Sequence, residues 1–209
     1  MSIQERRERE RQKIQEAILD AALRLYQEGG YENVTIRKIA SEIEYSPATL
    51  YLYYTDKEAI FNALREKGFS LLLEVQSRAY QNPNPLERLE QAGKSYLDFA
   101  IQYPTYYEIM FILKRKNTFP TSATCETSSF SSPTSYSQLA FEFLKNTVIA
   151  CMEEKLIPTA NPEAVSLLYW ACVHGLASLY IQGQLGMFPS NLVQNFLYQA
   201  FDYLSHFEL

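Results

Sequence analysis

The chain has 209 residues, of which 47% are hydrophobic, and this is enough apolar material for a buried core in one large domain or two small ones. Its net charge of −5 excludes a strongly basic protein that coats nucleic acid regardless of sequence, so any DNA contact must be local. The charged N-terminus and the lack of a run of about 18 apolar residues predict neither a secretory signal nor a membrane span, and we expect a cytoplasmic protein with no membrane partner.

The three cysteines are Cys125, Cys151 and Cys172, and they stand far apart in the sequence. An odd number of cysteines without a Cys-x-x-Cys pair is typical neither of a disulfide framework nor of a zinc site. Cys172 and His174 are two residues apart, so on a helix they face nearly opposite sides. We therefore expect reduced thiols, no metal and no cofactor.

Apolar residues recur at helical spacing along nearly the whole chain, and the alternation typical of strands is scarce. This pattern predicts an all-α fold. The first helix carries an apolar stripe from Ile14 to Tyr26. It is expected to stop at Gly29 and Gly30, because a left-handed C-cap has no steric cost at glycine.

Two short helices follow, and each begins with a residue that caps helices well. Thr35 is expected to cap a helix that runs to about Glu42. Ser46 is expected to cap the next one, with Pro47 at the first helical position, where its missing N–H has no cost.

The remaining helices are longer. Thr55-x-x-Glu58 matches a capping box and is expected to begin a helix that runs to about Tyr80. After a break at residues 82–85, helical spacing covers residues 86–103, 105–116, 139–156, 162–184 and 191–207. Residues 117–136 are rich in Ser, Thr and Pro and poor in large apolar side chains, so we expect a flexible insertion there.

The two short capped helices, joined by a tight turn near Glu44, have the length of a helix-turn-helix, whose second helix enters the major groove of DNA. Residues 34–40 (VTIRKIA) and 46–58 (SPATLYLYYTDKE) resemble the N-terminal domain of the tetracycline-repressor (TetR) family, and the resemblance spans roughly residues 12–62. The family usually has glycine where this chain has Glu44. A non-glycine residue in a left-handed turn costs on the order of 1 kcal/mol.

Ile39 and Leu50 are expected to point inward and hold the two short helices together, which leaves small residues at the start of the second helix to approach the groove. The resemblance implies a guanine contact by Arg37 and phosphate contacts by Thr35, Tyr51, Tyr53 and Lys57. The candidate DNA-binding residues are Thr35, Arg37, Ser46, Pro47, Ala48, Thr49, Tyr51, Tyr53 and Lys57. For any one of them, an ordinary solvated side chain is the alternative.

A cluster of basic residues lies close to the N-terminus and is interrupted by glutamates: Arg6, Arg7, Arg9, Arg11 and Lys13. One interpretation is an arm that enters a minor groove or follows phosphates. The other is a solvated extension of the first helix, held by ion pairs along it. The sequence favours neither.

Residues 170–175 (WACVHG) resemble the Trp-x-x-x-His-Gly (WHG) signature of one type of C-terminal domain in the same family. The resemblance implies that the last two helices pair with a second copy of the chain as a four-helix bundle. Such a homodimer would present two recognition helices about one DNA turn apart, to a near-palindromic operator. His174 by itself is interpreted as a core residue in preference to a metal or substrate ligand.

Aromatic side chains gather in the expected C-terminal helices, and sixteen tyrosines are more than a plain hydrophobic core needs, because each buried hydroxyl requires a partner. A cavity for a small apolar or aromatic effector would use such hydroxyls. The candidate ligand-binding residues are Tyr96, Phe99, Tyr103, Tyr107, Met110, Phe111, Phe143, Trp170 and His174. The alternative is that these residues only fill the core.

The sequence thus predicts a helix-turn-helix domain with a basic N-terminal arm in residues 1–55, and a ligand-sensing and dimerisation domain in residues 56–209. The predicted function is that of a repressor that an effector releases from its operator. Two other classes remain open, a helical enzyme and a protein-interaction module without DNA specificity. An enzyme has little support, because the chain lacks a glycine-rich phosphate loop, His-Glu-x-x-His and Gly-x-Ser-x-Gly.

Overall fold

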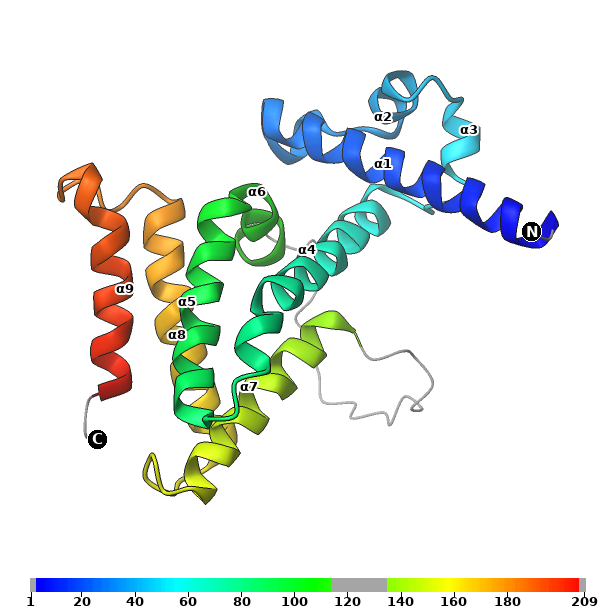
Figure 1. The fold of residues 1–209 in the computed structure, drawn as a ribbon. Coiled ribbons are helices and arrows are strands. Elements are labelled where there is room, and N and C mark those ends of the chain that lie inside the picture. Colours follow the sequence, from blue (N-terminus) through cyan, green and yellow to red (C-terminus); the bar gives the residue numbers. More distant parts are fainter. Residues whose placement is uncertain (1–2, 114–134, 207–209) are drawn as a thin grey trace, which may run out of the picture. The chain divides into compact units, whose positions relative to one another are not determined.

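The computed structural model describes residues 3–113 and 135–206, whose elements are labelled in Figure 1. Every regular element in those residues is a helix, which confirms the all-α class. The chain forms two compact units, Met1–Lys67 and Gly68–Leu209. The sequence placed the division after residue 55. The difference is about three turns at the start of α4 (Lys57–Tyr80), whose apolar side chains are buried within the first unit.

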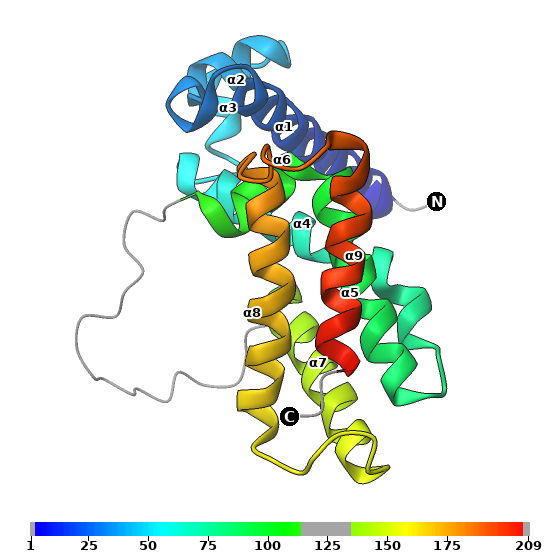
Figure 2. The same cartoon turned by 90° about the vertical axis from the view of Figure 1, so that its left-hand side faces the viewer.

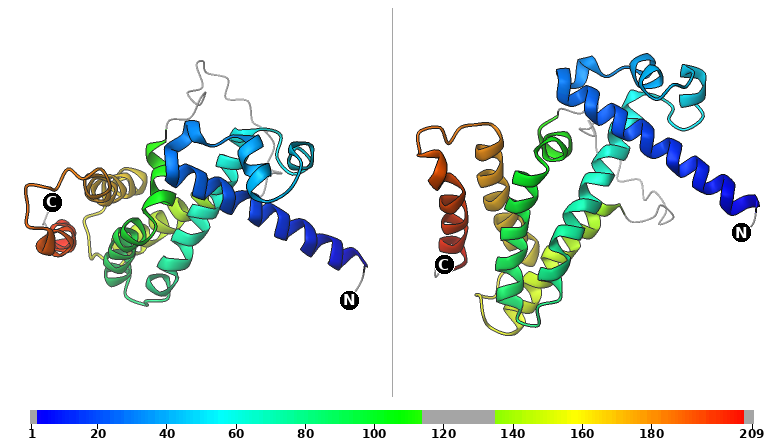
Figure 3. Two further views of the ribbon diagram at one scale, coloured as in Figure 1. Left: turned by 90° about the horizontal axis from the view of Figure 1, so that it is seen from above. Right: turned by 45° about the horizontal axis from the view of Figure 1, so that its top comes forward.

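Helix α1 (Ile3–Asn33) is the longest element of the first unit, and Figure 3 shows it running to the N-terminal end of the chain. Its backbone leaves helical geometry at Gly29 and Gly30, as predicted, and one further turn then continues to Asn33. The φ of Gly30 is 70°, in the left-handed region that glycine adopts without strain. The basic residues 6–13 lie inside α1. They therefore form a helical extension and not a separate arm.

The two short helices are α2 (Ile36–Glu42) and α3 (Pro47–Leu50), and both predicted caps are confirmed. The Oγ1 of Thr35 accepts the backbone N–H of Lys38 at 3.2 Å, and the Oγ of Ser46 accepts that of Thr49 at 3.1 Å. The turn between them has Glu44 at φ 60°, so a non-glycine residue does occupy the left-handed position that the sequence indicated.

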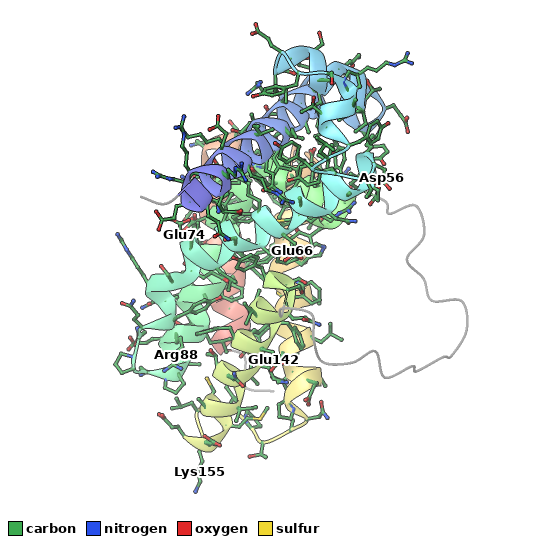
Figure 4. All side chains as sticks on the ribbon, turned by 90° about the vertical axis from the view of Figure 1, so that its right-hand side faces the viewer. Asp56, Glu66, Glu74, Arg88, Glu142 and Lys155 are labelled. Carbon is green, nitrogen blue, oxygen red and sulfur yellow. The ribbon has the colours of Figure 1, made fainter. Side chains whose placement is uncertain are left out.

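Helix α4 begins one residue later than the capping-box prediction. Asp56, labelled in Figure 4, accepts the backbone N–H of Ala59 through its Oδ1 at 2.8 Å and is therefore the N-cap. Glu58 does not close a capping box with Thr55. Its carboxylate pairs with the guanidinium of Arg65 at 2.9 Å, and the Arg65 side chain is almost fully buried.

The second unit is built around α5 (Pro85–Gln102), which packs against α7 (Tyr136–Glu153), α8 (Pro162–Ile181) and α9 (Ser190–His206). Figures 1 and 2 show α8 and α9 side by side. Between α5 and α7 the sequence predicted one helix over residues 105–116. The structure has a short α-helix, α6 (Pro104–Tyr107), followed by a π-helix, η1 (Glu108–Ile112). The predicted insertion lies outside the described residues except for Ser135 and Tyr136, which cap and begin α7.

Helix α8 is the most apolar of the described helices. By length and mean hydropathy (1.5) it is the one described helix that could cross a membrane, although the sequence predicted no such segment. Only 17% of that stretch is buried within the chain, on the side that carries Ser166, Tyr169, Val173 and Ala177. Its other side exposes large apolar residues.

Candidate functional site

The helix-turn-helix presents most of the predicted DNA-binding residues to solvent. Thr35, Arg37, Ser46, Pro47 and Ala48 are exposed, Tyr51 is 55% exposed, and Thr49, Tyr53 and Lys57 are half-buried. Ile39 and Leu50 are completely buried beneath them, as predicted. The apolar side of each short helix therefore fixes its position, and the polar side is left open to a partner.

The serine and threonine hydroxyl groups on this surface already have structural partners. Those of Thr35 and Ser46 cap their helices, and the Thr49 hydroxyl lies 2.9 Å from that of Ser46. A capping oxygen accepts the backbone N–H through a lone pair and keeps its own hydrogen. The hydrogen of Thr35 therefore stays available to a phosphate oxygen, as does that of whichever of Ser46 and Thr49 does not donate to the other. The same residues can thus start a helix and donate to DNA.

Lys57 is held more firmly than the sequence indicated. Its ammonium donates to the backbone carbonyl of Tyr31 at 2.6 Å and lies 3.6 Å from the centroid of the Tyr31 ring. The Tyr31 hydroxyl in turn donates to Glu58 at 3.1 Å. This contact ties the end of α1 to the start of α4, so Lys57 has a structural role in the first unit as well as any role towards DNA.

One feature of this unit was missed by the sequence analysis. Arg6, Arg7 and Arg11 of α1 line an open groove together with Glu10, Leu52 and Tyr53. Arg7 and Arg11 are four residues apart and so share one face of the helix. Only the fold shows that this face lies beside Tyr53, one of the predicted phosphate-binding residues.

The second unit contains an apolar cavity of about 280 Å³ among its helices. Its walls come from α4, α5, η1, α7, α8 and α9. The lining residues are Phe69, Leu72, Gln76, Tyr80, Leu89, Ala92, Gly93, Tyr96, Met110, Phe111, Ser137, Ala140, Phe141, Phe143, Leu144, Thr147, Tyr169, Trp170, Val173 and Phe201. Among these described residues there is no Lys, Arg, His, Asp or Glu. The cavity therefore suits an uncharged, largely apolar molecule.

Five of the nine predicted ligand-binding residues line this cavity: Tyr96, Met110, Phe111, Phe143 and Trp170. The other four do not. Phe99 is completely buried and packs against Tyr103 with ring centroids 5.6 Å apart. Tyr107 and His174 do not line the cavity but contact residues that do: Tyr107 packs on Tyr96 and Phe111, and His174 packs on Phe111 and Trp170.

A polar cluster of Tyr96, Tyr107 and His174 joins α5, α6 and α8 behind the cavity. The Nδ1 of His174 lies 2.8 Å from the Tyr107 hydroxyl and 3.2 Å from the Tyr96 hydroxyl. The Tyr107 hydroxyl is also 3.1 Å from the backbone carbonyl of His174. Burial lowers the pKa of His174 and raises the pKa of both tyrosines, so all three side chains are neutral near pH 7.

Three other polar groups of the cavity wall, on Gln76, Tyr80 and Thr147, are paired within the chain. The side-chain amide of Gln76 donates to the carbonyl of Ala92 at 2.9 Å and accepts the hydroxyl hydrogen of Tyr80. The Thr147 hydroxyl donates to the carbonyl of Phe143 at 3.0 Å. These three side chains therefore need no ligand to satisfy their hydrogen bonds.

The described residues offer no metal site, because no three His, Cys, Asp or Glu side chains among them lie close enough to share an ion. Cys151 is buried and Cys172 half-buried, and neither is in a disulfide. Burial raises the pKa of the Cys151 thiol to about 11, so this thiol is protonated and unreactive at pH 7. Cys125 lies outside the described residues.

A three-helix unit with an exposed α3, followed by a separate helical unit with an apolar cavity, defines the class of helix-turn-helix DNA-binding regulators. The chain matches the model for bacterial regulatory proteins of the tetR family over residues 18–64. It matches the model for the tetracyclin repressor-like C-terminal domain over residues 89–200. The chain therefore belongs to the TetR family of DNA-binding transcriptional regulators, which are not enzymes.

Similar proteins agree with this assignment. The HTH-type transcriptional repressor KstR of Rhodococcus jostii (strain RHA1) is 36% identical over 75 residues, which are 35% of this chain and about a third (34%) of KstR. A protein of unknown function from Rhodococcus sp. RHA1 has a similar structure, with a TM-score of 0.69, 21% identity and coverage of 91% of this chain and 93% of its own. FadR of Bacillus subtilis, crystallised with stearoyl-CoA, has a TM-score of 0.68 and 14% identity. The match covers 91% of this chain and 97% of the FadR chain. These two structures show the fold alone.

Proposed function

We propose that this regulator is a repressor that binds a near-palindromic operator as a homodimer and leaves it when an apolar effector enters the cavity of the second unit. The observation that carries the proposal is the cavity itself, because a core that only filled space would be packed without a void of about 280 Å³. A void of this size approaches the range of about 300–1,000 Å³ found for ligand pockets.

Operator recognition is assigned to the exposed surface of α2 and α3. Arg37, which is exposed on α2, is assigned to a guanine, and the small side chains of Pro47 and Ala48 would let α3 approach the groove, where either could contact a thymine methyl. Thr35, Ser46, Thr49, Tyr51, Tyr53 and Lys57 are assigned to the phosphates on either side.

The dimer interface is assigned to α8 and α9. These helices expose Leu167, Leu168, Leu179, Leu192 and Phe196. A set of large apolar residues on two adjacent helices is rarely left in water and is typical of a protein interface. Formation of a bundle with the partner's α8 and α9 would bury it, and the Trp-x-x-x-His-Gly motif would give this unit the WHG type of C-terminal domain.

The cavity favours a chain-like effector. Its wall on α4 is the stripe from Phe69 through Leu72 and Gln76 to Tyr80, which runs for about 16 Å at 1.5 Å per residue. A volume of about 280 Å³ over that length corresponds to a cross-section on the order of 20 Å², which would admit one hydrocarbon chain about 4 Å across but not two side by side. The stearoyl-CoA bound to the similarly folded FadR is a ligand with such a chain.

The signal from cavity to operator is assigned to α4. Its later residues form the cavity wall, and its first turns bury Ile60, Phe61 and Leu64 in the helix-turn-helix unit. A shift of α4 would therefore move residues that belong to both units. A coupling of about 1–3 kcal/mol changes operator affinity roughly 5- to 150-fold.

Selection of the bound sequence from a random DNA library, followed by fluorescence anisotropy, tests the DNA-binding part. We expect tight binding to a near-palindrome and weak, strongly salt-dependent binding to a scrambled duplex. Sedimentation of the Leu168→Glu variant tests the dimer, because a charge in the assigned interface should yield monomers. Equal affinity for both duplexes would contradict the proposed operator recognition. A Leu168→Glu protein that remains dimeric would contradict the proposed interface.

A further inference from the structure

Helices α4 and α5 form two long sides of the cavity and run in opposite directions (Figure 1). Gln76 of α4 donates to the carbonyl of Ala92 on α5 at 2.9 Å, so Leu89 on α5 lies level with Tyr80 at the end of α4. Phe69 lies about 16 Å from Tyr80, at the other end of the cavity stripe on α4. The cavity thus has two distinct ends, one at Phe69 and one at Tyr80.

The end at Tyr80 is closed by packed side chains. Leu89 and Tyr169 line the cavity and also belong to a packed core cluster with Val148 and Cys151 of α7. Val148 and Cys151 are completely buried, and Leu89 is only 2% exposed. A ligand that extends in this direction meets close-packed side chains and cannot advance without displacing them.

A pair of aromatic rings closes the same end towards solvent. Tyr80 and Phe143 stack with an angle of 27° between their ring planes, and both line the cavity while remaining half-buried. Tyr80 is fixed in place because its hydroxyl donates to Gln76, whose amide is held by the carbonyl of Ala92. The stack is therefore a wall with the cavity on one side and water on the other.

The end at Phe69 is built from aromatic rings of four elements that contact one another in series. Phe69 of α4 lies 5.5 Å from Phe111 of η1, Phe111 lies 6.4 Å from Trp170 of α8, and Trp170 lies 6.3 Å from Phe141 of α7, measured between ring centroids. All four side chains are partly exposed, and Trp170 is 36% exposed. Side chains that reach solvent are displaced more readily than those of a packed core, so a ligand can enter at this end.

We propose that the core cluster and the Tyr80–Phe143 stack form a stop that limits the effector to a straight chain of about ten carbons, which enters tail first at Phe69. A methylene group has a volume close to that of a water molecule in the liquid, roughly 30 Å³, so a cavity of about 280 Å³ holds on the order of ten carbons. An extended chain of this size is somewhat shorter than the stripe of about 16 Å, as it must be to end before the Tyr80 ring. This inference rests on the proposed function.

A series of methyl esters tests the limit: methyl hexanoate, octanoate, decanoate, dodecanoate and tetradecanoate. Dissociation constants are measured by calorimetry with the full-length protein, and operator release by fluorescence anisotropy. Burial of each added methylene should tighten binding about fourfold, so we expect a gain of roughly 15-fold for each step of two carbons up to methyl decanoate. The two longer esters should bind no more tightly than methyl decanoate, because their extra carbons stay in water or crowd the stop.

The Phe143→Ala variant removes one ring of the stack and leaves the core cluster in place. We expect this variant to bind methyl dodecanoate at least fivefold more tightly than methyl decanoate, a preference that the natural protein should lack. The matched control is Phe141→Ala, which removes a ring of the same helix at the entrance. It should weaken the binding of all the esters to a similar degree and keep the limit at methyl decanoate. Phe143→Leu keeps an apolar side chain against Tyr80, so it should fold even where Phe143→Ala does not, and should show a smaller shift in the same direction.

Two results would overturn the inference and leave the proposed function standing. One is an affinity that keeps rising by the same factor to methyl tetradecanoate, with release of the operator. The other is a pair of folded Phe143→Ala and Phe143→Leu proteins that both keep the limit at methyl decanoate. If no ester binds the cavity or releases DNA, the proposed function fails and the inference with it.

Discussion

The ring of Phe201 on α9 lies against Gly93 on α5 so closely that a Cβ added to Gly93 would stand 2.0 Å from Cζ of the ring. Beside this contact, the ammonium of Lys94 pairs with Asp202 at 2.7 Å, and the Tyr198 hydroxyl donates to Asp98. Because Gly93 has no side chain, the Phe201 ring can approach the backbone of α5, and this sets how α9 packs on α5. Phe201 is completely buried there and also contributes to the cavity wall.

The first prediction is that Gly93→Ala destabilises the protein by about 1–3 kcal/mol, because the new methyl group displaces the Phe201 ring. Helix propensity alone would stabilise the variant by up to about 1 kcal/mol. The control is Gly175→Ala on α8, where no atom of the same chain lies within 4 Å of the added Cβ. Because Gly175 shares a helix face with Leu168 and Leu179, which are assigned to the dimer, both glycine variants are compared in the Leu168→Glu background. Urea unfolding should show opposite signs for the two variants, and a Gly93→Ala protein more stable than the natural one would refute the contact.

The second prediction concerns base recognition. Arg37→Ala should lower operator affinity by about 1–3 kcal/mol for each half-site and relax the preference at one base pair of each half-site, as expected for loss of a bidentate guanine contact. Lys38→Ala serves as the control, because Lys38 is equally exposed on α2 but its ammonium is bonded to Asn33. Anisotropy against a set of single-base operator variants measures both. Unchanged selectivity in Arg37→Ala would remove Arg37 from the base-reading residues.

The third prediction concerns the groove on α1. If DNA phosphates reach Tyr53, they also meet Arg7 and Arg11, so Gln substitutions at these two positions should each reduce the slope of log affinity against log salt by about 1.8, which is about 0.9 for each subunit of the dimer. Arg9→Gln is the control on the same helix, because Arg9 does not line the groove. Equal slopes in all three variants would show that the helical extension contributes only general charge.

The fourth prediction is a pH dependence of stability. Burial lowers the pKa of His174 below its unfolded value of about 6.5, so the folded chain binds this proton less tightly than the unfolded chain does. The contribution of neutral His174 is complete above pH 6.5 and is lost as the pH falls below it. The free energy of unfolding should therefore drop more steeply between pH 7 and 5 in the natural protein than in His174→Gln. If the free energies of unfolding of the two proteins change in parallel with pH, the pKa of His174 is not lowered by folding.

Local rules predicted the helix-turn-helix well, because its caps and its turn depend on neighbouring residues. Thr35 and Ser46 cap as expected, and Glu44 occupies left-handed backbone without glycine. The same rules placed the α4 cap one residue early. Asp56 takes the capping position, while Glu58 is drawn away by the buried guanidinium of Arg65, a contact that no local motif reveals.

The cavity was harder to predict, because helical spacing shows which face of a helix is buried but not whether that face meets a void. Tyr96 and Phe99 are three residues apart on the same helix, yet only Tyr96 lines the cavity. The cluster joins Tyr96 to His174 across 78 residues of sequence. A pairing over that separation follows from the packing of α5 against α8 and has no local signature.

The most direct test of the account is the operator affinity of the natural protein and of an Ala140→Phe variant, each measured by anisotropy with and without saturating methyl decanoate. Ala140 lines the cavity, so the phenylalanine ring takes the space of the ligand. The account predicts that methyl decanoate lowers the affinity of the natural protein at least fivefold and leaves that of Ala140→Phe unchanged. An operator affinity that methyl decanoate leaves unchanged in the natural protein, while calorimetry shows it bound in the cavity, would contradict the account.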